Sequence, residues 1–98
     1  MEKSMKPNVK LLAQGTEFTA KRMRGKETYF LPKHAADVES IIFIHEGECI
    51  LFMDTEEIHL KPGDAYIIPP NVKHQFKGIT DFAGIHFMPK NINFKFYT

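Results

Sequence analysis

The side chains best suited to chemistry are five histidines and one cysteine. A neutral imidazole can ligate a metal, accept a proton or orient a ligand, so each histidine is a candidate by type. His45 and His59 belong to no motif, and we interpret them as surface or interface residues. Cys49 lies in an apolar run with no base at a fixed position relative to it, so we expect it to pack rather than to act as a nucleophile.

A cationic run, KRMRGKE, is a second candidate for binding chemistry. Lys21, Arg22, Arg24 and Lys26 could attract a carboxylate, a sugar acid or a phosphate. The simpler interpretation is a solvated strand and turn around Gly25, in which each exposed charge contributes little.

Composition limits the classes of protein to be considered. A length of 98 residues fits one domain, and a net charge of +1 gives no long-range attraction to nucleic acid or an anionic membrane. The apolar runs are shorter than the roughly 20 residues of a membrane-spanning helix. A lone cysteine and a charged N-terminal segment without a secretory signal predict a soluble, cytoplasmic protein.

The elements that must position these side chains are β-strands. Alternating or continuous apolar runs end at Gly and Pro residues, which interrupt ladders and helices. Pro62 and Gly63 suit the centre of a type II turn, and Gly47 suits a hairpin turn. Strands are therefore predicted over residues 16–23, 27–30, 39–45, 48–54, 56–60, 65–68, 72–76 and 82–88.

Near-continuous apolar runs on both sides of Gly47 indicate a sheet that is covered on both faces. A barrel of this size covers only one face by itself, so a homodimer is the simplest source of the second cover. The terminal segments, MKPNVKLLAQG and KNINFKFYT, are candidate covering arms that two subunits could exchange.

Residues 34–89 resemble the cupin superfamily. The second cupin motif, G-x5-P-x-G-x2-H-x3-N, is matched by GDAYIIPPNVKHQFKG, which supplies Gly63, Pro69 and His74. Asn71 replaces a glycine that it can mimic in backbone conformation, and Gly78 replaces the final Asn. The resemblance implies one cupin domain over residues 1–98, with its core motifs at about 34–89 and an all-β, antiparallel jelly-roll barrel.

The first cupin motif, H-x-H-x3-E-x6-G, is only partly matched. Aligned on Gly47, its two histidines and its glutamate fall on His34, Ala36 and Ser40, so one ligand of three is present. Glu39 is one residue from the glutamate position, and a strand would turn it to the opposite face unless a bulge intervened. The resemblance thus implies a degenerate site for Fe, Zn, Mn or Ni, held weakly by His34 and His74 or without metal.

The site predicted for a small-molecule ligand comprises His34, Tyr66, His74, Gln75 and His86. His86 belongs to this site only if the last long strand points its side chain into the barrel. Tyr66 and Gln75 are included because their polar groups could orient a ligand. The catalytic residues, if any, and the ligand's identity are not predicted.

Three functions follow from these expectations. The preferred one is a dimeric barrel that binds a small polar or aromatic molecule. The alternative is a metal-dependent dioxygenase, isomerase or lyase. The segment from IFIHEGECILFMD to FAGIHFMP is also similar to the sensory domains of AraC-type regulators, which implies a stand-alone sensor. No helix-turn-helix follows it, so no direct contact with nucleic acid is expected.

Overall fold

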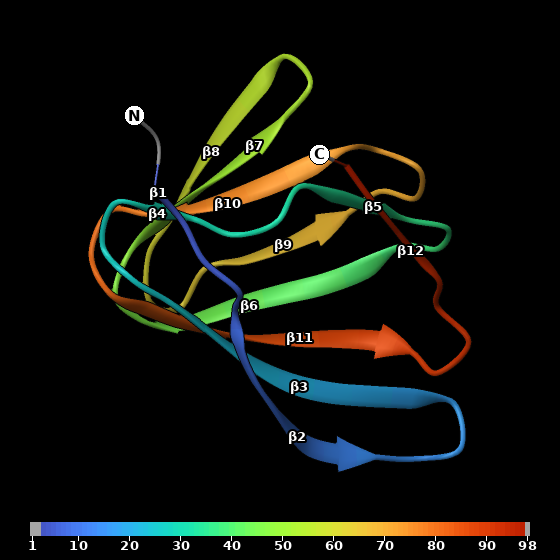
Figure 1. Ribbon diagram of the computed structural model, residues 1–98. Helices are drawn as coiled ribbons and strands as arrows, with labels where there is room; N and C mark the ends of the chain where they lie inside the picture. The colour runs from blue at the N-terminus through green and yellow to red at the C-terminus, as the bar shows by residue number, and fades with distance from the viewer. Residues whose placement is uncertain (1–2, 98) are drawn as a thin grey trace.

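Two mainly antiparallel sheets curl against one another in the computed structural model, which describes residues 3–97 (Figure 1). One sheet joins seven strands, and its two longest ladders pair β7 with β10 and with β8. Its strands are β1 (Lys3–Ser4), β4 (Tyr29–Phe30), β5 (His34–Ala36), β7 (Cys49–Met53), β8 (Glu56–Leu60), β10 (His74–Gly78) and β12 (Phe94–Phe96). The expected all-β barrel architecture is confirmed.

The second sheet has five strands in the order β2-β3-β11-β6-β9, with β11 at its centre. Figure 1 shows it as the lower sheet, with β2 at its outer edge. Its strands are β2 (Asn8–Gln14), β3 (Phe18–Gly25), β6 (Ser40–Glu46), β9 (Ala65–Ile68) and β11 (Phe82–Pro89).

Side chains that alternate along these strands form the core between the sheets. On β6, Ile42 and Ile44 are fully buried, whereas Ile41, which precedes them, is 42% exposed. The same alternation buries Cys49, Leu51 and Met53 on β7. The period of two thus separates an inner from an outer face on both sheets. Removal of these apolar surfaces from water is the main force that closes the barrel.

Two turns fix the geometry of the motif region. Gly47 has φ of 67° in the β6–β7 hairpin, and a Cβ atom there would collide with the backbone of Asp81 and Phe82. Only glycine therefore fits this turn. Asn71 has φ of 64°, as expected for a residue that replaces glycine in the cupin motif.

All eight predicted strands are present, with ends that shift by a few residues. Four additional strands, β1, β2, β5 and β12, were not predicted. The terminal segments pair within the chain, since β2 lies against β3 and β12 lies against β5. Within residues 3–97, no helix is long and apolar enough to cross a membrane.

Candidate functional site

A cavity of about 450 Å³ opens beside the inner face of β3 and β11. This volume is within the range typical of small-molecule sites. Most of its lining is apolar, and two lysines and two histidines are its polar members. The lining residues are Lys6, Pro7, Val9, Lys21, Met23, Leu31, Pro32, His34, Phe76, His86, Met88, Phe94 and Phe96.

His34 and His74 face one another across neighbouring strands. They are register partners on β5 and β10, and their ring centroids are 4.4 Å apart. His34 Nδ1 lies 3.1 Å from the carbonyl oxygen of Pro32, and His74 Nδ1 lies 2.9 Å from that of Val72. Because a carbonyl only accepts hydrogen bonds, each Nδ1 carries the proton and each Nε2 presents a lone pair.

Burial keeps both imidazoles neutral. Desolvation lowers the pKa of His34 and of His74 below the ordinary value, and the proximity of His34 lowers that of His74 further. His74 is only 3% exposed, and its Nε2 has no hydrogen-bond partner among the described residues. An unpaired buried acceptor of this kind is costly in a folded protein, so a ligand that donates a hydrogen bond would relieve it.

His86 joins this group from the opposite sheet. Its Nε2 lies 2.7 Å from Oγ of Ser40, the residue at the position of the family glutamate. Desolvation, followed by the effects of His34, His74 and Lys21, lowers the pKa of His86 to about 4. The structure therefore brings three neutral histidines together. Two of them, His34 and His86, line the cavity, whereas His74 contacts His34 and is outside the cavity lining.

Two phenylalanines of β12 close the group from the solvent side. The ring centroids of Phe94 and Phe96 lie 5.4 Å and 5.3 Å from that of His34. Phe96 is nevertheless 63% exposed, and both rings line the cavity. The sequence predicts this segment only as a covering arm, because a strand of three residues is too short to indicate that it completes the site.

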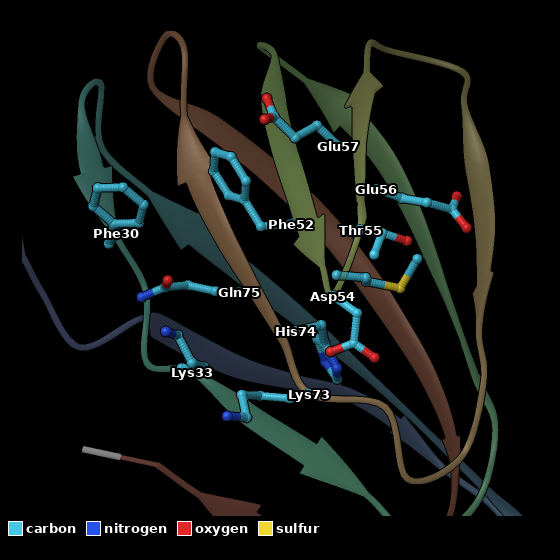
Figure 2. Close-up of a pocket in the computed structure, with 11 residues that line it drawn as sticks. Phe30, Lys33, Phe52, Asp54, Thr55, Glu56, Glu57, Lys73, His74 and Gln75 are labelled. Carbon is cyan, nitrogen blue, oxygen red and sulfur yellow. The ribbon is translucent and has the colours of Figure 1, made fainter.

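Gln75 does not join the histidines. Neighbouring residues of a strand point to opposite faces, so Gln75 lies on the outer face of β10 while His74 lies on the inner face. Its amide donates a hydrogen bond to the carbonyl oxygen of Leu31, 3.0 Å away. Figure 2 shows it with Phe30 and Phe52 in a groove of about 540 Å³ that His74 also borders.

Tyr66 is on the inner face of β9 and packs against the core, but it does not line the cavity. Cys49 is fully buried among apolar side chains, which raises the pKa of its thiol to about 12. That thiol stays protonated at neutral pH and is a poor nucleophile. His59 is on the surface, where its Nε2 lies 2.7 Å from Glu48 Oε1.

The donor set does not complete the metal site that the cupin resemblance implies. His34 and His74 each offer a lone pair at Nε2, but Ala36 has no donor and Ser40 offers only a hydroxyl. Glu39 is exposed and precedes β6, so no bulge brings its carboxylate inward. Within residues 3–97, no group of three His, Cys, Asp or Glu side chains is arranged to hold an ion.

Comparison with known proteins identifies the architecture. A family model described as a cupin domain matches residues 24–86. A cupin-2 domain protein from Shewanella frigidimarina has a TM-score of 0.77 at 19% identity, and the match covers 85% of this chain and 80% of that one. No curated protein matches the sequence.

Two further structures show how widely this fold is shared. A protein from Klebsiella pneumoniae with a double-stranded β-helix domain has a TM-score of 0.82 at 17% identity, over 95% of this chain and 85% of that one. Salicylate 1,2-dioxygenase from Pseudoaminobacter salicylatoxidans has a TM-score of 0.82 at 13% identity, over 92% of this chain but 30% of that one. At such identities the likeness establishes the fold alone.

Proposed function

The chain belongs to the cupin domain family, and from this premise we propose that it binds a small polar or aromatic molecule in the barrel cavity without a metal. His34, His74 and His86 orient the molecule, and the apolar walls enclose it. The observation that carries the proposal is an apolar cavity of about 450 Å³ that is lined by two neutral histidines, His34 and His86. The ring of His74, whose buried Nε2 has no partner among the described residues, lies against that of His34.

The cavity supports this proposal through its chemistry. Small-molecule sites are mostly apolar, with a few polar groups that fix orientation. Here the aromatic rings of Phe76, Phe94 and Phe96 supply the apolar contacts. The lone pair of His34 Nε2 is available as a hydrogen-bond acceptor for a hydroxyl or amine of the bound molecule.

The alternative is a metal-dependent enzyme such as a dioxygenase, an isomerase or a lyase. It is favoured by the two imidazoles whose Nδ1 atoms are held by carbonyl oxygens, an arrangement common among metal-ligating histidines. With Ala36 and Ser40 at the other ligand positions, Fe, Zn, Mn or Ni would bind weakly. We therefore rank metal-free binding first.

We also propose that the barrel forms a homodimer through the outer face of the five-stranded sheet. Phe87, Ile41 and Ile67 are register partners on three adjacent strands and are 39%, 42% and 57% exposed. These three side chains are exposed in the part of the chain that the structure describes, and we call them the outer apolar row. A second copy is the occupant that matches it, because an isologous contact pairs an apolar surface with itself.

A cytoplasmic location completes the proposal. Its support is the single buried cysteine, since disulfides are typical of proteins from oxidising compartments.

Truncation of Phe96 tests binding in the cavity. We expect Phe96→Ala to weaken the binding of naphthalene-2-methanol by about tenfold, because one aromatic wall is lost. Fluorescence anisotropy of the probe gives the dissociation constant, and the chain contains no tryptophan to interfere. Phe18→Ala is the matched control, since Phe18 is similarly exposed at 61% but does not line the cavity. Equal affinity of the two variants, or no binding by the parent protein, would refute the proposal.

A further inference from the structure

Lys21 places a positive charge beside the histidines. It lies on β3 directly opposite His86 of β11, and both residues line the cavity. The ammonium group is close enough to contribute to the lowered pKa of His86. Lys6 lines the same cavity from the segment between β1 and β2. Residues far apart in the sequence thus bring two cations to one apolar pocket.

Among the described residues, no opposite charge offsets these cations inside the cavity. Among residues 3–97, none of the cavity-lining side chains is acidic. The ion pairs between described residues join Arg24 to Glu46 and His59 to Glu48, with a longer contact between His45 and Glu46, so they involve neither lysine. Lys21 is half-buried, and a partly desolvated cation attracts an anion more strongly than an exposed one does.

The histidines do not supply this positive charge themselves. His34 presents a lone pair at Nε2, which repels an anionic oxygen and attracts a hydrogen-bond donor. An anionic group of a ligand is therefore drawn to the lysines. A phosphate would require several converging donors or an arginine fork, whereas Lys6 and Lys21 are the only cations among the described lining residues.

We propose that the cavity selects an apolar, aromatic monocarboxylate whose carboxylate lies against Lys21, with Lys6 at the entrance. This inference rests on the proposed binding function and specifies its ligand class. The ring system of the carboxylate fills the space between Met23, Phe76 and Phe96. Neighbouring residues of the cationic run therefore lie on opposite faces of β3. Lys21 points inward, whereas Arg22 is on the outer face.

Three naphthalene probes of matched size test the charge preference: 2-naphthoate, naphthalene-2-methanol and 2-(aminomethyl)naphthalene. Anisotropy titrations at neutral pH are expected to show that 2-naphthoate binds about tenfold more tightly than the alcohol, while the cationic amine binds most weakly. In Lys21→Met the advantage of 2-naphthoate over the alcohol should fall to about threefold or less.

Two further variants separate the charge from its surroundings. Lys21→Arg keeps the positive charge and should keep the preference for 2-naphthoate. Lys10→Met removes a lysine from the outer face of β2, outside the cavity lining, and should also keep it. A preference that survives Lys21→Met unchanged would overturn the inference.

These experiments also distinguish a failure of the charge preference from a failure of the proposed binding function. Equal binding of all three probes, weakened by Phe96→Ala, would refute the charge preference and leave the cavity as a binding site. Binding that is indifferent to Phe96→Ala, or absent for every probe, would refute both.

Discussion

Replacement of Ile41 and Phe87 by glutamate is expected to convert a dimer into a monomer of 11.3 kDa. The two side chains are register partners on the outer apolar row. Buried anchor residues of an interface each contribute about 2 kcal/mol or more, so the pair should weaken association by roughly a thousandfold. In an isologous dimer, the introduced carboxylates would also face their own copies.

Light scattering coupled to size-exclusion chromatography measures the mass directly. Ile79→Glu is the matched control, because Ile79 is 38% exposed but lies in the turn between β10 and β11, away from the row. The parent protein and Ile79→Glu should both have twice the monomer mass. A monomeric parent protein at micromolar concentration would refute the dimer.

Acid should destabilise the fold through His86. The pKa of this side chain is lowered to about 4 in the folded protein, chiefly by burial, from an ordinary value of 6.5. The unfolded chain therefore binds a proton at a higher pH than the folded chain does, and stability falls as the pH drops from about 6.5 to about 4. Discounted for the partial exposure of the ring, the loss is about 2 to 3 kcal/mol.

Urea denaturation at neutral pH and near pH 4.5 tests this linkage. His86→Gln keeps a polar partner for Ser40 but cannot be protonated, so its stability should fall less with acid than that of the parent. The lowered pKa values of His34 and His74 add losses in the same direction to both proteins. His59→Gln, which changes an exposed histidine, should match the parent. Identical acid sensitivity of His86→Gln and the parent would contradict the assignment.

Burial alternates along β6, β7 and β10, and the sequence predicted all three strands, whereas the missed strands β2, β5 and β12 show no such alternation. All seven residues of β2 are exposed, so no apolar alternation marks it as an edge strand. β5 and β12 have three residues each, too few to show a period. These strands form because partners already in place, β3 for β2 and β10 for β5, supply their hydrogen bonds.

Site residues could be predicted from the sequence where a motif determined which face of its strand each side chain occupies. His34 and His74 were placed by the two cupin motifs, and the structure puts them in register. Gln75 follows His74 in the same strand, so its side chain points to the opposite face. The prediction of Gln75 as a site residue rests on its polarity alone and takes no account of this alternation. Lys21 and Phe96 come from strands outside the motifs, and only the paired sheets bring them to the cavity.

Elemental analysis by mass spectrometry tests most directly whether this cavity binds its ligand without a metal. Protein purified without chelator is incubated with Fe, Zn, Mn and Ni, freed of excess ions, and compared with His34→Ala, His74→Ala and the surface control His59→Ala. Two imidazoles without a carboxylate should retain metal far below stoichiometry, equally in all four proteins. Near-stoichiometric metal that is lost in His34→Ala and His74→Ala, but kept in His59→Ala, would contradict the account and favour the metal-dependent enzyme.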